Sequence, residues 1–377
     1  MFLRLGATAF GGPPAQAAMI RDEVVHRRQW MTQEDFLDRL GAANLIPGPN
    51  TAEITIYTGL LRAGYPGLFV AGVAYALPAA IIVTVFAWLY VRFGTLPQVG
   101  HLLHGAKPAV VAVVGRAIWR LGKTAVRSRF LAVLGVSAIG GTLAGLGTLT
   151  VIAGAGAIAG LQDWWRRGRR DATAPAILGS ILAALAGSEA APPLAGSETA
   201  LGKAGTATVF LYFLRTGALI FGGGAVLIAL LQRDLVGVLH WVSARQLLDA
   251  VAVGWMTPGP VFTTATFVGY VILGWKGAVA ATVGIFLPSF FACAISGPLI
   301  PKLRGSPAAG AFLDGVNAAS VALMAAVTWD LARAAMVDPL SIVLALASLA
   351  VLLWRDVNSA WIILASSLIG LAAGYFA

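Results

Sequence analysis

The sequence has few charges and almost no cysteine, and both shortages narrow the class of protein. Charged residues make up only 11% of the 377 positions, whereas hydrophobic residues make up 58%. This balance excludes an ordinary soluble domain and indicates an integral membrane protein. The single cysteine, Cys293, excludes a disulfide scaffold and a cysteine-based metal cage, and we interpret it as a small packing residue.

Histidine is also scarce, and its four residues show no zinc-protease spacing such as HExxH. His101 and His104 are one helical turn apart, but they have no nearby carboxylate or cysteine, so we expect loop residues rather than metal ligands. We therefore expect neither enzymatic activity nor a cofactor or metal site.

The positive charge, a formal excess of +10 at pH 7, lies at expected helix ends rather than on a polar domain. It is an orientation signal for a membrane protein, and we expect no nucleic-acid partner. The first motif follows Met1 without a charged leader or a small-residue cleavage site, which predicts that the first helix is retained.

Long apolar runs dominate what is present. Each is close to the ~20 residues that a bilayer-spanning helix needs, and none alternates in polarity with the period of two that a barrel strand requires. The runs extend over Leu68–Val91, Gly277–Ile300, Leu340–Trp354 and Ala360–Phe376. The expected fold is an all-α polytopic helix bundle surrounded by lipid.

The chain also contains the same pattern twice. FLRLGATAFGG at residues 2–12 returns as FLRTGALIFGG at residues 213–223, a shift of 211 positions. The same shift pairs Trp30 with Trp241, Asp38 with Asp249, and the PGP sequence at 47–49 with that at 258–260. We predict an N-terminal repeat at residues 1–170, a connector at 171–204 and a C-terminal repeat at 205–377.

The two copies differ in charge. Residues 1–170 hold 17 Lys/Arg and 7 Asp/Glu, whereas residues 205–377 hold 8 and 6. The basic clusters of the first copy are expected to be cytoplasmic. They comprise Arg116, Arg120, Lys123, Arg127 and Arg129, and then Arg166, Arg167, Arg169 and Arg170.

The second copy has no basic excess in the loop that corresponds to the first cluster. Instead, Lys302 and Arg304 lie in the loop that corresponds to Arg92–Lys107. The bias therefore changes sides, and we infer that the halves are inserted in opposite orientation, as in many secondary transporters. Inversion requires an odd number of membrane crossings in the repeat unit plus the connector. Residues 172–187 can supply the extra crossing, and a surface helix is the alternative there.

Two motifs in each copy break helices that would otherwise run on. A single glycine-proline kink would be structural, but four breaks at repeat-equivalent places point to a substrate site lined by irregular backbone. The predicted substrate-binding residues in these breaks are Phe10, Gly11, Gly12, Pro47, Gly48 and Pro49, and Phe221, Gly222, Gly223, Pro258, Gly259 and Pro260.

The chemistry of these breaks favours an anion. A half-helix that starts after PGP directs its free N–H groups and its positive dipole end toward the break. Hydroxyl and amide donors follow at once, as Asn50 and Thr51 in the first copy and as Thr263 and Thr264 in the second. The alternative is that the threonine hydroxyls bond to preceding carbonyls of their own helices.

Arg4 and Arg215 occupy the same place in the two copies, roughly two turns before the glycine pair. An arginine at membrane depth costs ~2.5–3.5 kcal/mol on insertion scales, so it usually faces a cavity or a partner. Either residue can grip an oxyanion with two hydrogen bonds. For Arg4 the alternative is a side chain that snorkels to the interface.

Five further charged residues are candidates for coupling or gating. Arg21-Asp22 and Arg233-Asp234 follow the first helix of each copy and suggest a salt-bridged gate or a helix-end anchor. Glu53 lies just after PGP in an apolar helix, where it can carry a coupling proton or form a structural ion pair.

Together these motifs resemble the chromate ion transporter family. The resemblance rests on FGGP at 10–13, RDE to RRQW at 21–30, LIPGPNT at 45–51 and RAGYPG at 62–67, and on FGGG at 221–224 and TPGP at 257–260. It implies a bacterial inner-membrane protein of the long-chain, two-domain type, with antiparallel halves. It also implies chromate export with imperfect discrimination against sulfate.

We expect a secondary transporter that works by alternating access on chromate or a related tetrahedral oxyanion. Transport of sulfate or another oxyanion, or an anion channel that uses the same half-helix dipoles, is the alternative. Pairs of small residues such as Gly141/Gly145, Gly156/Gly160 and Gly370/Gly374 permit close helix packing, either within the chain or in a homodimer.

Overall fold

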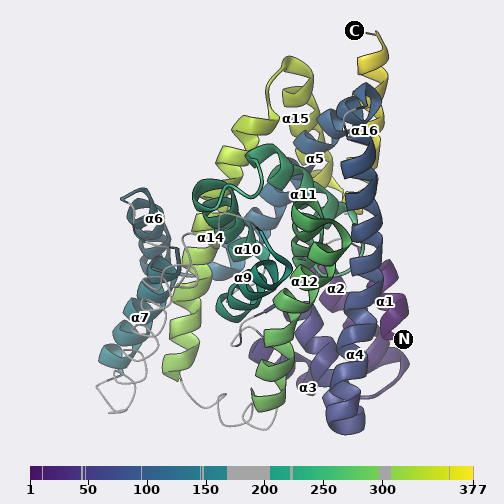
Figure 1. The fold of residues 1–377 in the computed structure, drawn as a ribbon. Coiled ribbons are helices and arrows are strands. Elements are labelled where there is room, and N and C mark those ends of the chain that lie inside the picture. Colours follow the sequence, from purple (N-terminus) through teal and green to yellow (C-terminus); the bar gives the residue numbers. More distant parts are fainter. Residues whose placement is uncertain are drawn as a thin grey trace.

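The computed structural model describes residues 1–377 except 11, 44–45, 47, 95, 145, 147, 168–203, 221–223, 297–306, 356 and 377. The predicted extra crossing at 172–187 and the loop with Lys302 and Arg304 lie outside the described residues. Every regular element of the described part is helical (Figure 1), which confirms the all-α class.

Each copy contributes one series of helices. The first copy forms α1 (Phe2–Thr8), α2 (Gly12–Arg21), η1 (Asp22–Arg27), α3 (Gln33–Ala43), α4 (Asn50–Phe93), α5 (Pro97–Ala125), α6 (Arg129–Leu143) and α7 (Thr148–Arg166). The second forms α9 (Thr206–Leu219), α10 (Gly224–Leu231), η2 (Gln232–Val238), α11 (Ala244–Met256), η3 (Val261–Thr263), α12 (Thr264–Ser296), α14 (Pro307–Ala335), α15 (Pro339–Trp354) and α16 (Ser359–Phe376).

Unusual backbone conformations recur at matching places in the two copies. The long helix α4 kinks at Gly64 (φ 62°, ψ −151°), and α12 kinks at Gly274 with nearly the same angles (φ 62°, ψ −148°). Gln29 and His240, 211 positions apart in the sequence, both have a positive φ, 52° and 51°. The repeat seen in the sequence is therefore also a repeat of local structure.

The two copies exchange helices. The first copy's α5 packs against α15 and α16 of the second, while the second copy's α14 packs against α6 and α7 of the first (Figure 1). Small residues permit this approach: a Cβ on Gly105 would lie 2.9 Å from the Cα of Gly370, and one on Gly315 would lie 2.7 Å from the Cβ of Ala159. Gly370 and Gly156 thus pack within the chain, the first of the two expected arrangements.

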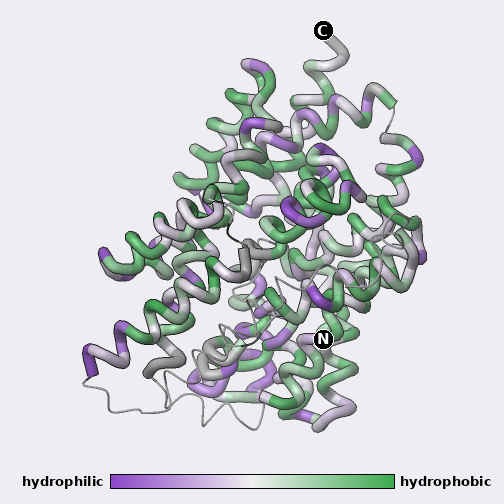
Figure 2. The backbone as a smooth tube through the Cα atoms, turned by 60° about the vertical axis from the view of Figure 1, so that its left-hand side comes forward, coloured by the Kyte–Doolittle hydropathy of each residue, from purple (hydrophilic) through white to green (hydrophobic). Residues whose placement is uncertain are grey.

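The apolar character continues along the helices. Within the described residues, three helical stretches are long and apolar enough to cross a bilayer, namely Asn50–Phe93, Val261–Ser296 and Gly310–Arg333, and α6, α15 and α16 are shorter apolar helices. Figure 2 shows hydrophobic residues along most of the tube and hydrophilic ones in short segments, many of them near helix ends. The polytopic membrane class is confirmed.

One expected loop is a helix. His101, His104 and Lys107 were assigned to the connection after Arg92, but they lie in the first three turns of α5, which begins with Pro97 at its N-terminus. Proline is favourable at the first position of a helix, because its missing N–H has no intrahelical partner there. Lys107 is therefore carried by a helix rather than by a loop.

Candidate functional site

The two PGP loops lie at the contact between the copies, and each loop donates a hydrogen bond to the other copy. The backbone N–H of Gly48 donates to the carbonyl of Ile220 at 2.9 Å, and the N–H of Gly259 donates to the carbonyl of Ala9 at 3.0 Å. Ala9 and Ile220 follow the first helices of their copies and are themselves equivalent positions. Because the two hydrogen bonds join equivalent positions in opposite directions, they have approximate two-fold symmetry.

Glycine is required at the centre of both loops. Gly48 has a φ of 139° and Gly259 a φ of 90°, values that side-chain-bearing residues rarely adopt. A Cβ on Gly48 would also press on Ser289 of α12, and one on Gly259 would press on Ala79 of α4. Each loop is therefore packed against the long helix of the opposite copy.

The structure brings most predicted PGP residues together at this contact. Gly48 and Pro49 are buried directly before α4, and Asn50 begins that helix. Pro258, Gly259 and Pro260 are buried between α11 and η3. Pro47 lies outside the described residues.

The glycine-pair breaks are partly described. Phe10 is half-buried in the gap between α1 and α2, and Gly12 is the first residue of α2. Gly11 lies outside the described residues, as do Phe221, Gly222 and Gly223 of the second copy. In that copy α9 ends at Leu219 and α10 begins at Gly224. The helix breaks predicted at these motifs are present in the flanking elements.

The two PGP sites differ in polarity. Beside Gly48 lie the side chains of Glu53 and Ser289, both fully buried. The carboxylate oxygens of Glu53 and the hydroxyl of Ser289 make no hydrogen bond of acceptable geometry to the described residues. At the equivalent places of the second site stand Thr264 and Ala79.

Glu53 lies in the first turn of α4, at the positive end of the helix dipole. The second site has no acidic residue at the equivalent position, which is Thr264. The two PGP-initiated helices therefore differ in the acidic group near their positive ends.

The threonine hydroxyls satisfy themselves within their own helices. Thr263 donates to the carbonyl of Pro260 at 2.9 Å, and Thr264 donates to that of Val261 at 2.8 Å. In the first copy Thr55 donates to Ala52 at 2.6 Å. These hydroxyls therefore bond to preceding carbonyls, which was the alternative expected from the sequence. Their protons are not directed at a ligand here. Thr51 is buried in the first turn of α4.

Arg4 lies on the surface of α1 and forms an ion pair. Its guanidinium is 2.6 Å from Glu23, and its side chain is 59% exposed. Arg28 donates to the same carboxylate at 2.9 Å, and this hydrogen bond, helped by the charge of Arg4, holds the pKa of Glu23 below its ordinary value. Arg4 can bind an oxyanion only by leaving Glu23. Its counterpart Arg215 is half-buried on α9.

The structure corrects the alignment of the second charged pair. Because Gln29 and His240 keep the 211-residue shift, Asp234 corresponds to Glu23 and not to Asp22. Asp22 is paired with Arg27 at 2.9 Å, and Arg233 lies 3.9 Å from Asp234. Arg21 ends α2 and is half-buried.

Sequence reasoning missed a buried ion pair. Lys107 of α5 lies 3.0 Å from Asp249 of α11, and Tyr90 of α4 donates to the same carboxylate at 2.9 Å. Asp249 is completely buried, and Lys107 is the one basic side chain among the described residues that is buried. Asp249 lies about 10 Å along α11 from the second PGP loop. The sequence signal that could have identified the pair is a charged residue flanked by apolar positions, as Lys107 and Asp249 both are.

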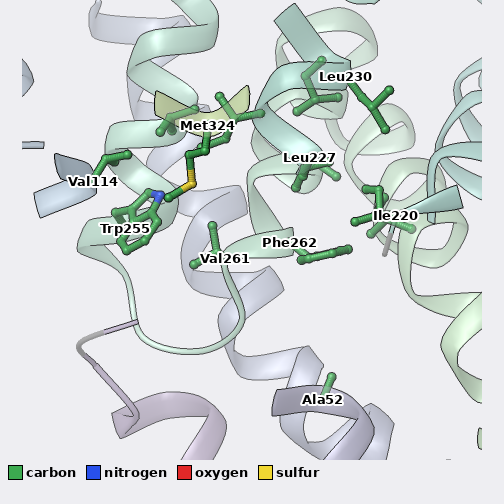
Figure 3. Packing of buried hydrophobic residues seen from close by; sticks show 14 of the residues in the cluster. Ala52, Val114, Ile220, Leu227, Leu230, Trp255, Val261, Phe262 and Met324 are labelled. Carbon is green, nitrogen blue, oxygen red and sulfur yellow. The ribbon is translucent and has the colours of Figure 1, made fainter. Parts of the chain in front are cut away.

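The packing around this pair leads to the second PGP loop. Figure 3 shows Trp255 of α11 near Val114 and Met324, and it shows Val261 and Phe262 directly after the loop. Tyr90 also packs on Phe267 of α12, with ring centroids 5.2 Å apart. Tyr90 thus links the Asp249 carboxylate of α11 to α12, the helix that follows the second PGP loop and η3.

The fold and the site together define a class. Paired helix breaks between two copies of one unit, inside an apolar helix bundle, are the arrangement of secondary membrane transporters. The chain belongs to the chromate transporter family, whose model matches residues 1–161 and 207–371.

Curated relatives agree with this assignment. The chromate transport protein of Cupriavidus metallidurans is 32% identical over 99% of this chain and 91% of the relative. The chromate transport protein of Pseudomonas aeruginosa is 34% identical over 88% of this chain and 80% of the relative. No solved structure matches. The protein is a membrane transporter and not an enzyme.

Proposed function

We propose that this protein exports chromate across the bacterial inner membrane by alternating access, and that sulfate competes for the same site. The observation that carries the proposal is the reciprocal contact of the two PGP loops, since irregular backbone at the contact between repeats is where secondary transporters bind substrate. The family assignment and the relatives' names support chromate as cargo.

The copies face opposite sides of the membrane in this proposal, and the oxyanion binds between them. Their two-fold exchange of helices allows each copy to take the conformation of the other, which opens the site alternately to the two sides. The basic clusters around Arg120 and Arg166 lie in the cytoplasm.

Lys107 supplies the countercharge for the bound oxyanion. In the present conformation its ammonium group is held by the carboxylate of Asp249. An oxyanion that enters from the second PGP loop, with its free helix N-terminus, takes the place of this carboxylate on Lys107. The membrane potential drives export, because outward movement of one negative charge is favoured by ~2.3 kcal/mol per 100 mV.

The test is chromate accumulation in energised everted vesicles that contain the protein. We expect saturable accumulation that excess sulfate inhibits and that Arg215→Gln reduces, since Arg215 is the half-buried arginine of the pair predicted from the sequence. Folded protein that moves no chromate would overturn the proposed cargo. Accumulation that sulfate leaves unchanged would overturn the shared site.

The role of Lys107 is tested by removing both charges together. Lys107→Gln alone leaves the buried carboxylate of Asp249 without its countercharge, which costs about 3–5 kcal/mol and can prevent folding. The double variant Lys107→Gln/Asp249→Asn avoids this cost, so we expect it to fold with near-normal thermal stability and to lose chromate transport. Normal transport by the double variant would show that the ion pair is only structural.

A further inference from the structure

A row of buried polar side chains lies along the contact between α4 of the first copy and α12 of the second. Glu53 and Tyr57 are four residues apart, so they lie on one face of α4. Ser289, Cys293 and Ser296 have the spacing of one face of α12. Each of the five is at most 8% exposed. This polar row extends from the first PGP loop to Ser296, the last residue of α12.

At the end of α12 the polar row is closed by a hydrogen bond between the copies. The hydroxyl of Tyr57 lies 2.6 Å from that of Ser296. Ser296 donates its own proton to the carbonyl of Ala292 at 2.5 Å. Tyr57 is therefore the donor to Ser296, and its proton points toward the end of the helix.

At the PGP loop the polar row ends in a carboxyl group. A Cβ on Gly48 would press on both Ser289 and Glu53, so these two side chains lie side by side. Neither the carboxylate oxygens nor the hydroxyl of Ser289 has a hydrogen bond of acceptable geometry within the described part of the chain. Buried polar atoms of this kind normally bond to ordered water. This end of the row is therefore suited to hold a proton beside a water molecule.

Cys293 lies between the two ends. Its Sγ is 4.0 Å from the carbonyl oxygen of Glu53, and it also neighbours the hydroxyl of Tyr57. One turn of α4, about 6 Å along its axis, separates Glu53 from Tyr57. One water beside Ser289 spans this distance, since each hydrogen bond covers about 2.8 Å. Tyr57 and Cys293 are the titratable groups that neighbour Glu53, and no charged side chain of the described residues pairs with it.

The repeat contains the same contact a second time, and there it is apolar. Beyond the kinks the two copies are related by a shift of 210, as Pro78 and Pro288 show. The positions equivalent to the polar row are Thr264, Val268, Ala79, Val83 and Phe86. The one hydroxyl among them, that of Thr264, bonds within its own helix. Packing of the two long helices thus needs no polar row, and buried polar groups are costly in a membrane, which indicates a functional role.

We propose that the polar row conducts protons between the end of α12 and the carboxyl group of Glu53. Each hydroxyl group or water accepts a proton from one neighbour and passes its own to the next, so only bonds to hydrogen form and break. Proton relays in membrane proteins consist of such chains of buried groups. The inference rests on the proposed transport function, because a proton that reaches Glu53 neutralises a carboxylate beside the first PGP loop.

The test follows Glu53 itself and needs no chromate. Purified protein in a lipid film is held at a pH at which the carboxyl group is protonated, and infrared spectra are recorded while H₂O is replaced by D₂O. The carboxylic acid band that Glu53→Gln lacks belongs to Glu53. The rate at which this band shifts is the rate at which protons reach and leave the group.

Tyr57→Phe interrupts the polar row with little damage, because Ser296 keeps its bond to Ala292. We expect this variant to slow exchange at Glu53 about tenfold, the factor that corresponds to one lost hydrogen bond. Ser296→Ala should slow the exchange in the same way, since it removes the acceptor of the Tyr57 proton.

The matched control is Thr58→Val, which should exchange as fast as the wild type. It removes a buried hydroxyl next to Tyr57 that donates to Ile54 of its own helix at 2.7 Å, outside the row. Equal slowing in Thr58→Val and Tyr57→Phe would overturn the proposal, because it would show only disturbed packing. Exchange at the wild-type rate in Tyr57→Phe would also overturn it.

Two further outcomes would count against the proton path. A spectrum without an acid band that depends on Glu53 would show that the group stays ionised. A carboxylate band of Glu53 that shifts when sodium replaces a large organic cation would assign the cluster to a bound metal ion. The absence of chromate flux in vesicles would overturn the proposed function and leave this infrared result unchanged, so the two failures are distinguishable.

Discussion

At the residue scale, the two PGP glycines carry the contact between the copies. Gly48→Ala and Gly259→Ala force a side chain into a positive φ and against Ser289 or Ala79. We expect each variant to lose about 2 kcal/mol or more of stability and to lose chromate transport. Gly115→Ala is the control, since a Cβ there meets nothing within 4 Å. Thermal unfolding together with vesicle uptake checks the prediction, and normal uptake by both loop variants would contradict it.

Glu53 gives a second prediction at this scale. Its buried carboxylate lies at the positive end of α4, so protonation removes a charge that competes with the oxyanion. We propose that Glu53 carries the coupling proton, in which case Glu53→Gln mimics the protonated state and makes chromate flux independent of pH. The exposed Glu34→Gln on α3 serves as control. A Glu53→Gln protein with the full pH dependence of the wild type would refute this role.

Single residues also show where sequence reasoning stops. The glycine and proline motifs were recognisable because backbone geometry restricts which residues can occupy a break. The pair of Lys107 and Asp249 was not recognised, since it joins α5 to α11 across the fold. The threonines were correctly described only by the alternative, in which they bond to their own helices.

At the element scale, the N-cap side chains of the equivalent helices α6 and α15 contribute to the stability of the protein. Asp338 accepts from the N–H of Ser341 at 2.6 Å in a capping box at the start of α15, and its counterpart Ser128 accepts from Leu131 at 3.2 Å at the start of α6. We expect Asp338→Ala and Ser128→Ala each to destabilise the protein by about 1 kcal/mol. Thermal unfolding of both variants checks this, and an unchanged unfolding temperature would contradict the capping role.

The cap of α15 also has a pH dependence of known sign. The hydrogen bond from the Ser341 backbone, helped by His104, lowers the pKa of Asp338, which lies in the turn before the helix. Because this pKa is lower in the folded state, the ionised side chain stabilises the fold at pH values above the ordinary pKa of about 3.9. This stabilisation is lost as the pH falls through the lowered pKa. The difference between wild type and Asp338→Ala should therefore shrink only in acid.

Elements also divide into those that the sequence predicted and those that it did not. The apolar runs and the breaks at FGG and PGP were predicted, because length and proline placement act locally. The apolar runs were expected to begin only at Leu68 and Gly277, just after the kinks at Gly64 and Gly274, where both glycines adopt a φ of 62°. What was not predicted is that α4 and α12 continue as helices on both sides of these kinks.

At the scale of the whole molecule, the sequence predicted the repeat, and the structure adds how the copies meet. The packing of α5 and α14 against helices of the other copy could not be predicted from the sequence. Hydropathy shows which side of a helix is apolar, but not which helix packs against it. The reciprocal hydrogen bonds of Gly48 and Gly259 give this packing its two-fold character. The charge bias adds the proposal that the copies are inverted in the membrane.

The central claim is that the two copies face opposite sides and enclose the oxyanion path between them. Val126 and Val337 test it most directly, because they are exposed and occupy equivalent turns before α6 and α15. Each is replaced by cysteine in a Cys293→Ala background and is labelled in intact cells and in everted vesicles with a membrane-impermeant maleimide. If the copies are inverted, Val126→Cys reacts only in everted vesicles and Val337→Cys only in intact cells. Labelling of both from the same side would contradict it.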